Sequence, residues 1–496
     1  MSLIQVSNLS FSYEDSYDMI FENVSFQIDT DWKLGFTGRN GRGKTTFLKL
    51  LLGEYEYSGS ITASVKFDYF PFPVEDMTMD TMGVIEGLGY EIPFWKIQKE
   101  INQLDLDDGI LYREFGTLSN GERTKVLLAA LFSQDNHFLL IDEPTNHLDR
   151  EARMQVSRYL NTKKGFILVS HDRAFLDTCV DHILAVNKSG IEVQKGNFTD
   201  WYQNKQRKDQ YELAENERLK KDIRRLGEAA RKSRSWADRA EASKIGRKPE
   251  DKGNFFAERA YIGEKSRRMQ QRRKNLERRQ EQALEEKKGL LKDLESIESL
   301  RLEPLSYYKK QIAALDDVEI RYGERTVCEH ISFCVEQGDR IVLQGKNGCG
   351  KSSLLKLLLG ELKPASGRVT VGSGAVISYV PQDTSFLKGN LKDYARECGI
   401  EESLFKALLR KLDFTRTQFE KNMESFSEGQ KKKVLIARSL CEKAHLYIWD
   451  EPLNFIDIYS RMQIEELILG TEFTLLFVEH DGAFCEKIAD RCVTIG

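Results

Sequence analysis

Long apolar segments are absent from this sequence. No run approaches the roughly 18 to 20 apolar residues that cross a bilayer. The opening residues, MSLIQVSNLSFSYE, lack the basic region and apolar region of a signal peptide. We therefore expect a cytoplasmic protein that is neither secreted nor inserted in a membrane.

Paired cysteines are lacking as well. The eight cysteines are scattered, and no two stand at the spacing of a zinc site or a redox motif. We expect free thiols in a reducing compartment, which excludes a disulfide framework. The eight are Cys179, Cys328, Cys334, Cys349, Cys398, Cys441, Cys485 and Cys492.

Neither positive nor negative charge is in large excess over the whole chain. Lys+Arg number 74 and Asp+Glu 78, a net charge of -4 that by itself argues against nucleic-acid binding. The average conceals an uneven distribution, because residues 201–280 hold 25 Lys+Arg and 13 Asp+Glu. This basic segment is therefore where a polyanion would be bound.

What the sequence does contain is an internal repeat. Its 496 residues suffice for several domains of about 100 to 200 residues, and four motifs recur in the same order. Two copies of one domain are therefore predicted. The paired motifs are GRNGRGKT (38–45) with GKNGCGKS (345–352), LSNGE (118–122) with FSEGQ (426–430), FLLIDEP (138–144) with LYIWDEP (446–452), and SHD (170–172) with EHD (479–481).

The glycine-rich motif is expected to bind phosphate. It lies between a predicted strand (33–37 or 340–344) and a predicted helix, so its backbone N–H groups would form an anion nest. Lys44 and Lys351 would reach the β- and γ-phosphates of a nucleotide. Thr45 and Ser352 would bind Mg²⁺. The phosphate-loop residues are Gly38, Asn40, Gly41, Gly43, Lys44, Thr45 and Thr46 in one copy, and Gly345, Asn347, Gly348, Gly350, Lys351, Ser352 and Ser353 in the other.

Two carboxylates end a later apolar strand in each copy. Strands without polar alternation are typical of a parallel sheet buried on both faces, so an α/β cassette is expected. Asp142 and Asp450 are predicted to hold Mg²⁺ through water, unless the pair is a solvated acidic turn. Glu143 and Glu451 are predicted to orient or deprotonate the attacking water.

One histidine follows a further apolar strand in each copy. His171 and His480 are two of only seven histidines, and they fall at the same place in both repeats. They are predicted to sense the γ-phosphate, with a purely structural role as the alternative.

Together these motifs resemble those of ATP-binding-cassette (ABC) ATPases, over about residues 1–200 and 307–496. The resemblance implies that two cassettes close head to tail, with each ATP between the phosphate loop of one and the LSxGE-type signature of the other. It also implies that Tyr13 and Tyr322 stack on adenine, unless they are core tyrosines. The implied sites combine Lys44, Asp142, Glu143 and His171 with Ser427 and Gly429, and Lys351, Asp450, Glu451 and His480 with Ser119 and Gly121.

The resemblance further implies that the two sites differ. Gln382 stands where this family has a glutamine that ligates Mg²⁺, whereas Phe72 takes the aligned place in the first copy. We expect ATP at both sites and unequal turnover.

Residues 201–304 belong to neither repeat, and the predicted domains are 1–200, 201–304 and 305–496. Helix breakers gather at 244–256, which predicts a helical hairpin with its tip there. Aromatic rings among basic residues at the tip are the pattern that stacks on unpaired RNA bases, unless they only close the hairpin. The predicted RNA-contacting residues are Lys244, Lys252, Phe255, Phe256 and Arg259.

Tandem cassettes with a long basic linker resemble, more narrowly, the ABC-F proteins that bind the ribosome. The expected fold is α/β, with two tandem ABC-type P-loop ATPase domains joined by a long α-helical hairpin linker. The implied cofactors are ATP and Mg²⁺. The implied partner is a bacterial-type ribosome, where the linker would enter the exit site near 23S rRNA and the P-site tRNA.

The short first cassette and long linker resemble the antibiotic-resistance subgroup, which protects ribosomes against lincosamides, pleuromutilins and streptogramin A. A monomer with intramolecular cassette pairing and no obligate protein partner is implied. A translation factor that relieves stalled ribosomes is the nearest alternative. A second alternative is an importer ATPase, but such a protein would need no basic hairpin and would be expected to keep glutamine at position 72. A third is a chromosome-maintenance ATPase, in which the coiled coil would separate the glycine-rich motif from the Asp-Glu motif, whereas here both motifs lie within each copy.

Overall fold

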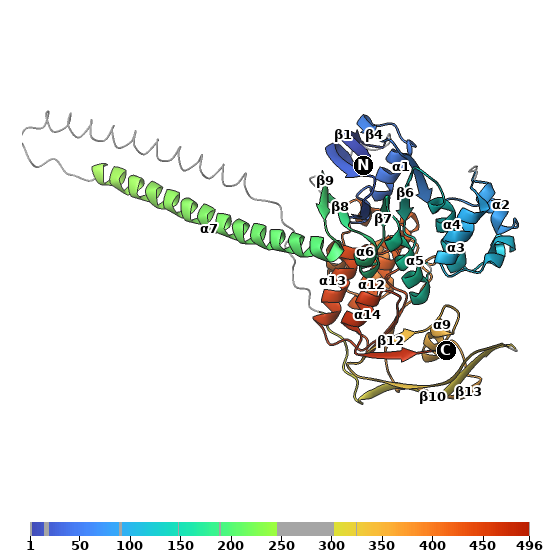
Figure 1. Ribbon diagram of the computed structural model, residues 1–496. Helices are drawn as coiled ribbons and strands as arrows, with labels where there is room; N and C mark the ends of the chain where they lie inside the picture. The colour runs from blue at the N-terminus through green and yellow to red at the C-terminus, as the bar shows by residue number, and fades with distance from the viewer. Residues whose placement is uncertain are drawn as a thin grey trace, which may run out of the picture. The chain divides into compact units, whose positions relative to one another are not determined.

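The computed structural model describes residues 2–13, 19–88, 92–146, 148–187, 190–245, 302–323 and 325–495, with backbone alone at 187, 223, 226, 227 and 229–245. The chain divides into two compact units, residues 1–201 with 299–496, and residues 202–298. Both repeats thus lie in one unit. In Figure 1 the first repeat runs from blue to teal and the second from yellow to red.

A largely parallel sheet forms the centre of each cassette. The strand order is β5-β6-β7-β3-β8-β9 in the first cassette, where only β9 is antiparallel, and β14-β15-β16-β12-β17 in the second. The strand before each phosphate loop, β3 or β12, therefore lies inside the sheet. The strands are β3 Lys33–Thr37, β5 Lys66–Phe70, β6 His137–Asp142, β7 Phe166–Val169, β8 His182–Asn187, β9 Gly190–Lys195, β12 Arg340–Gln344, β14 Ile377–Val380, β15 Leu446–Asp450, β16 Leu475–Val478 and β17 Arg491–Thr494.

The apolar runs form strands because both faces of the sheet are covered. All four residues of β7 and of β16 are buried. On β15, Tyr447 and Trp449 pack into one hydrophobic core while Leu446 and Ile448 pack into the other. The predicted α/β fold with a parallel core sheet is confirmed.

A second, antiparallel sheet covers one face of each core sheet, and the sequence analysis did not predict it. The orders are β2-β1-β4 and β11-β10-β13, with the phosphate-loop helix α1 or α9 in the same core as the sheet. The period of two is visible in β1, where Ile4, Val6, Leu9 and Phe11 are buried. The elements are β1 Leu3–Phe11, β2 Phe21–Asp29, α1 Lys44–Leu52, β4 Ser58–Thr62, β10 Gln311–Tyr322, β11 Arg325–Glu336, α9 Lys351–Leu358 and β13 Ser366–Val371.

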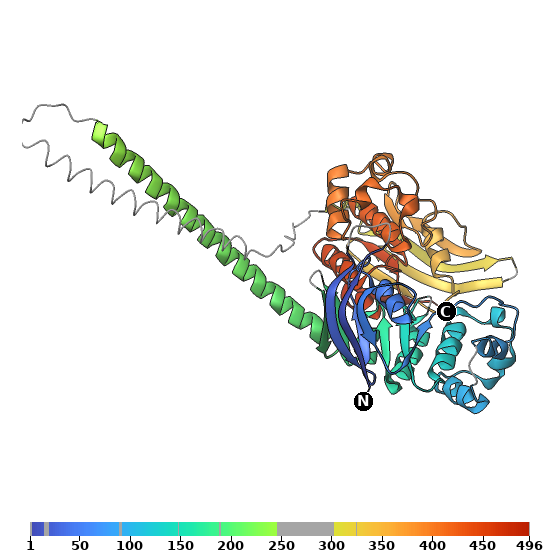
Figure 2. The ribbon, with the colours of Figure 1, turned by 90° about the horizontal axis from the view of Figure 1, so that it is seen from above.

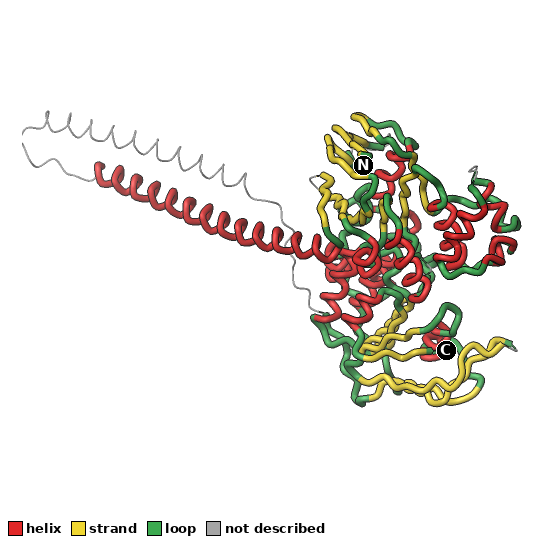
Figure 3. Tube along the Cα trace, viewed as in Figure 1, coloured by secondary structure: helices red, strands yellow, loops and turns green. Residues whose placement is uncertain are grey.

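Helices pack on the opposite face of each core sheet. Figure 3 shows them in red beside the yellow strands, and Figure 2 shows the two cassettes of this unit from above. They carry the signature motif at the start of α4 and α12. The helices are α2 Thr81–Glu86, α3 Phe94–Gln103, α4 Asn120–Phe132, α5 Arg150–Thr162, α6 Arg173–Cys179, α10 Leu391–Glu397, α11 Glu402–Lys411, α12 Glu428–Cys441, α13 Ile458–Leu469 and α14 Gly482–Ile488.

The first helix of the predicted hairpin is present as α7, Phe198–Ile245. The predicted tip, the second helix and the residues Lys252, Phe255, Phe256 and Arg259 lie outside the described residues. Lys244 lies in α7, where only the backbone is described.

Candidate nucleotide-binding sites

Each phosphate loop connects a core strand to a helix that begins at its lysine. Gly43 and Gly350 cap α1 and α9 with φ of 87° and 97°, the left-handed region that glycine adopts without strain. Lys44 Nζ donates to the carbonyl of Gly38 at 2.7 Å, and Lys351 Nζ to that of Gly345 at 2.8 Å. The loop carbonyls thus hold each ammonium at the anion nest.

Thr45 and Asp142 form a magnesium-type ligand pair in the first cassette. Thr45 Oγ1 donates to Asp142 Oδ2 at 3.1 Å, and the Tyr69 hydroxyl donates to the same oxygen at 3.0 Å. Burial raises the pKa of Asp142, because no cation compensates its charge fully. The arrangement fits a divalent cation.

The second cassette repeats the pair with Ser352 and Asp450. Burial raises the pKa of Asp450, and a hydrogen bond from Ser352 opposes the shift. Asp450 Oδ1 is buried and has no hydrogen-bond partner among the described residues. A buried carboxylate oxygen without a donor is costly, so this site also fits Mg²⁺.

The two predicted catalytic glutamates share a strained backbone. Glu143 and Glu451 follow their strands with φ of 51° and 46°, which non-glycine residues rarely adopt. Their backbone N–H groups donate to Val169 and Val478 of the neighbouring strands at 2.9 and 3.0 Å. Each glutamate lines the cavity at the phosphate loop of its own cassette.

The protonation of these two carboxylates differs. Burial, with Asp142 adding to it, raises the pKa of Glu143 to about 8. Burial also acts on Glu451, but the neighbouring His480 and a hydrogen bond from Asn454 outweigh it and lower the pKa of Glu451. Near neutral pH without nucleotide, Glu143 is therefore largely protonated and Glu451 is ionised.

Each predicted histidine faces its glutamate. His171 Nε2 lies 3.4 Å from Glu143 Oε1, and His480 Nε2 lies 3.7 Å from Glu451 Oε1. Burial and the neighbouring Lys44 lower the pKa of His171 far below its usual value, so its ring is neutral. A neutral imidazole can donate to one oxygen while it accepts at its other nitrogen.

The glutamine position follows from strand register. In the parallel strand pairs, Phe70 lies opposite Ile141, and Val380 lies opposite Trp449. Ile141 directly precedes Asp142, and Trp449 directly precedes Asp450. Phe72 and Gln382 therefore hold equivalent places, as the sequence alignment has them. Gln382 Nε2 donates to Glu451 Oε2 at 2.9 Å, a bond that a phenyl ring cannot make.

The cassettes face each other head to tail at both sites. The cavity at the second phosphate loop, about 530 Å³, is lined by Asn120, Leu148 and Arg153 of the first cassette together with Lys351 and Glu451 of the second. At the first phosphate loop a cavity of about 550 Å³ is lined by first-cassette residues. At the second site, Asn120 of the first-cassette signature thus lines the same cavity as the opposite phosphate loop.

Cross-cassette contacts at the first site involve the signature glycine. Asn40 Nδ2 donates to the Phe455 carbonyl at 3.1 Å, and Arg39 pairs with Asp413 at 2.5 Å. A Cβ on Gly429 would overlap the same Phe455 oxygen, so only glycine permits this approach.

The signature serines begin helices. Ser119 caps α4 and Ser427 caps α12, each in a reciprocal capping box with Glu122 or Gln430. The signature, which the family resemblance pairs with the opposite phosphate loop, thus lies at the partially positive N-terminus of a helix in each cassette.

The two tyrosines predicted to stack on adenine are not core residues. Tyr13 and Tyr322 are 40% and 49% exposed. Their hydroxyls bond to Thr46 at 2.8 Å and Ser353 at 3.1 Å, and both line the nucleotide cavities. Their exposed rings are available to a base.

Three site residues escaped the sequence analysis. Tyr69 bonds Asp142, Asn454 donates to Glu451 at 2.7 Å, and Arg153 donates to the His480 carbonyl of the other cassette at 3.1 Å. Tyr69 and Tyr379 recur at the same place in both copies, a signal that could have revealed the first. Nothing local to Arg153 indicates its partner across the interface.

Comparison with known proteins agrees with this geometry. The family model described as ABC transporter matches residues 21–146 and 328–454, just over half of the chain. The chain belongs to the ABC transporter family. Its two cassettes bind ATP, and the protein is an ATPase. No helix in the described ranges combines the length and apolar character needed to cross a bilayer.

Relatives cover nearly the whole chain. Ribosome protection protein VmlR of Bacillus subtilis is 28% identical over 99% of this chain and 86% of its own length. ATP-binding protein Uup of Buchnera aphidicola is 27% identical over 99% and 80%. Both matches extend over the two cassettes and the segment between them.

Solved structures support the fold. The archaeal ribosome recycling factor aABCE1, solved in complex with the stalk protein aP1, has a TM-score of 0.64 at 18% identity, covering 98% of this chain and 87% of that one.

Proposed function

We propose that this ATPase binds the bacterial-type ribosome in its ATP-bound state and protects the peptidyl-transferase centre from antibiotics. The observation that carries the proposal is the match to a ribosome protection protein over 99% of this chain. The basic segment 201–280 between the cassettes supplies the charge that rRNA and P-site tRNA would attract. The protein acts in the cytoplasm as a monomer.

ATP binding is the switch in this proposal. A nucleotide held by Lys351 and Ser352 would also meet Asn120 and Arg153 of the other cassette, because all four line one cavity. Its binding energy therefore favours the closed pair of cassettes. Mg²⁺, when bound, neutralises phosphate charge. It would be held by Thr45 and Asp142 at the first site, and by Ser352, Asp450 and Gln382 at the second.

Hydrolysis releases the closed state. Glu451 is ionised and fixed by Gln382 and Asn454, so it is ready to accept a proton from water. Glu143 must first lose its own proton. The second site is therefore the faster of the two, and the first serves mainly to hold the cassettes together.

The ribosome part is tested by trapping. The double variant Glu143→Gln with Glu451→Gln should sediment with bacterial ribosomes in ATP and remain free in ADP. Adding Lys44→Ala and Lys351→Ala should abolish this sedimentation, because the phosphate loops lose their lysines. Recovery of the double variant free of ribosomes in ATP would contradict the proposal.

Drug protection is tested separately. In a cell-free translation reaction stopped by a lincosamide, a pleuromutilin or streptogramin A, the wild-type chain should restore synthesis. A chain without residues 244–256 should hydrolyse ATP at the same rate and restore nothing. The residues Lys244, Lys252, Phe255, Phe256 and Arg259 are proposed to act at this step by contacting RNA.

The same assays address the second candidate, a translation factor for stalled ribosomes. We retain this candidate because Uup is about as similar to this chain as VmlR is, 27% against 28% identity, and its name mentions ATP binding but no ribosome protection. It predicts rescue of stalled synthesis without any drug and no rescue of drug-inhibited synthesis.

A further inference from the structure

Two adjacent lysines of α12 are buried in the second cassette, and they bond to different parts of the molecule. Lys432 is 2% exposed and Lys433 is 5% exposed. Lys432 Nζ donates to the Pro381 carbonyl at 2.9 Å, whereas Lys433 Nζ donates to Asp457 Oδ2 at 2.8 Å. Burying an ammonium group is costly unless it is paired, so two of them on consecutive residues indicate a role beyond packing.

Lys433 lies on the side of α12 that meets the first nucleotide site. Besides Asp457, it donates to the Leu412 carbonyl at 2.9 Å. The next residue, Asp413, pairs with Arg39 of the first phosphate loop at 2.5 Å. Lys433 therefore fixes the part of the second cassette that this phosphate loop contacts.

The start of α12 meets the same phosphate loop. A Cβ on Gly429 would lie 3.5 Å from Asn40 Nδ2, and Asn40 donates to the Phe455 carbonyl at 3.1 Å. The first phosphate loop is thus in contact with α12 at the helix N-terminus, and it is linked to the next turn through Asp413 and Lys433.

Lys432 faces the second nucleotide site instead. Its partner Pro381 directly precedes Gln382, whose Nε2 donates to Glu451 Oε2 at 2.9 Å. Burial lowers the pKa of Lys432, and nearby carboxylates, that of Glu451 among them, oppose the shift. Lys432 therefore connects α12 with the segment that holds the predicted catalytic glutamate of the second site.

Two further side-chain bonds fasten α12 to the same segment. The Thr384 hydroxyl donates to Glu428 at the start of the helix, and the Arg438 guanidinium donates to the Tyr379 carbonyl. Together with the Lys432 bond, they hold the segment along most of the helix length. A shift of α12 therefore moves the glutamine with it.

The first cassette lacks this connection. Within the described part of the chain, no side chain of α4 forms a hydrogen bond with residues 69–75, the counterpart of the glutamine segment. The lysine, the glutamate and the arginine that make the three bonds in α12 are replaced in α4 by Thr124, Asn120 and Ala130. The glutamine itself is replaced by Phe72, so α4 has neither the link nor the group that the link would position.

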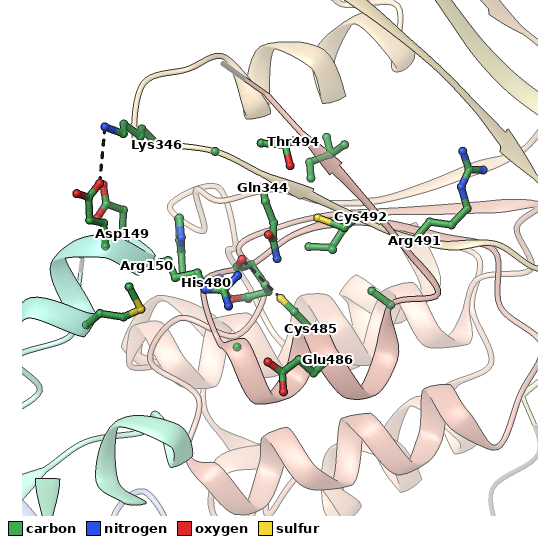
Figure 4. Close-up of a pocket in the computed structure, with 18 of the residues that line it drawn as sticks. Asp149, Arg150, Gln344, Lys346, His480, Cys485, Glu486, Arg491, Cys492 and Thr494 are labelled. Carbon is green, nitrogen blue, oxygen red and sulfur yellow. Dashed lines mark hydrogen bonds and ion pairs between the residues drawn. The ribbon is translucent and has the colours of Figure 1, made fainter. Parts of the chain in front are cut away.

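The contacts of the second phosphate loop differ as well. Lys346, which takes the place of Arg39, pairs with Glu151 of the first cassette at 3.6 Å, the dashed line in Figure 4. These side chains are 83% and 62% exposed, whereas Arg39 and Asp413 are 25% and 19% exposed. Because an exposed ion pair is screened by water, it contributes little, and the reverse route is weak at its first step.

We propose that Lys432 is a positioning residue that couples the occupancy of the first nucleotide site to ATP turnover at the second, in this direction only. ATP at the first phosphate loop holds α12, Lys432 holds the Pro381 carbonyl, and Gln382 holds the Glu451 carboxylate. Coupling between binding free energies is reciprocal, but coupling to a turnover rate need not be. The inference rests on the proposed turnover at the second site and does not involve the ribosome.

The coupling is measured as a ratio of two turnover numbers for the second site. In Glu143→Gln the first site holds ATP without hydrolysing it, and Lys44→Ala added to this variant empties the first site. Lys432→Met keeps the length of the side chain but removes the donor, so it should reduce the ratio of filled to empty by about threefold or more. Thr124→Met, the same change at the equivalent position of α4, should leave the ratio as it was. An unchanged ratio in Lys432→Met, or an equal decrease in both variants, would overturn the proposal.

A double-variant cycle separates positioning from a general effect on folding. In the Glu143→Gln chain, Lys432→Met should lower kcat and leave KM for ATP nearly unchanged, because the lysine does not line the nucleotide cavity. Once Gln382→Phe is present, Lys432→Met should lower kcat no further, since both changes remove the same link. A second, independent loss of kcat would show that the lysine acts otherwise and would contradict the proposal. Sedimentation of the trapped double variant with ribosomes does not depend on this cycle, so a failure of the coupling and a failure of the proposed function are distinguishable.

Discussion

Gln382 Nε2 donates a 2.9 Å hydrogen bond to Glu451 Oε2, and Phe72 stands at the equivalent chain position in the first cassette. The bond helps to keep the Glu451 carboxylate ionised. Glu143 Oε1 is buried with no hydrogen-bond donor among the described residues, and its pKa rises to about 8. The missing amide is therefore one difference between the two sites, beside the effects of His480 and Asn454 on Glu451.

Phe72→Gln should therefore activate the first site. In a Glu451→Gln background, where only Glu143 can act, the added amide donor should lower the pKa of Glu143. A decrease of one pKa unit, from about 8 to about 7, would raise the ionised fraction, and the single-turnover rate at pH 7, by about fivefold. Phe72→Leu, which adds no donor, should change little, and equal rates for the two variants would contradict the argument.

The two sites should also differ in their pH dependence. A buried carboxyl with a raised pKa becomes a base only as the pH rises through that pKa. In Glu451→Gln, kcat/KM for ATP should increase through about pH 8, the pKa of Glu143. In Glu143→Gln no such rise is expected there, since Glu451, whose pKa is lowered, is already ionised. Parallel profiles would rule out the difference in protonation.

The core of each cassette could be predicted from sequence because its signals are local. The strands over 33–37 and 340–344 were predicted at their observed bounds, since a short apolar run before a glycine-rich loop has few alternatives. The antiparallel sheets were not predicted. Strands such as β1 alternate over only a few residues, and register shifts between Val6 and Phe11 interrupt the pattern.

Contacts between the cassettes could not be predicted. Arg153 and Arg173 look like ordinary surface arginines in their helices, yet Arg153 donates to the His480 carbonyl and Arg173 pairs with Glu465 across the interface. Such partners lie about 300 residues away in the chain, and no spacing rule relates them. Only the repeat itself indicated that the cassettes would pair.

The two signature glycines should respond in opposite ways to alanine. A Cβ on Gly429 would overlap the Phe455 carbonyl oxygen, which accepts the Asn40 bond from the other cassette. Gly429→Ala should destabilise the nucleotide-free chain by about 1 to 3 kcal/mol. Among the described residues, which do not include His147 at the place of Phe455, a Cβ on Gly121 would meet Leu148 and Ala152 at 3.7 and 3.8 Å, ordinary contact distances.

Gly121→Ala should accordingly leave the nucleotide-free chain as stable as before, or stabilise it by about 0.5 to 1 kcal/mol through helix propensity. Both variants would be compared by urea unfolding without ATP. A loss of stability of the same size in both would show that the Phe455 carbonyl is not the constraint at Gly429.

The last prediction concerns Glu465, a fully buried carboxylate with two cationic partners. Arg173 of the first cassette pairs with it, and Lys487 donates to it at 2.9 Å. Arg173→Ala leaves the buried Glu465 with Lys487 as its one remaining cationic partner of the two. The free energy of unfolding should therefore fall by about 3 to 5 kcal/mol. Lys487→Ala should cost about 1 kcal/mol or less, because that lysine side chain is 46% exposed.

A compensating variant separates loss of the charge pair from loss of packing. Glu465→Leu, added to Arg173→Ala, removes the uncompensated charge and should recover most of the lost stability in urea unfolding. If the double variant were as unstable as Arg173→Ala alone, the arginine would contribute by packing instead. At the equivalent positions of the repeat, Ser157 and Gly482 cannot form this pair. The ionic link between α6 and α13 therefore has no counterpart at these equivalent positions.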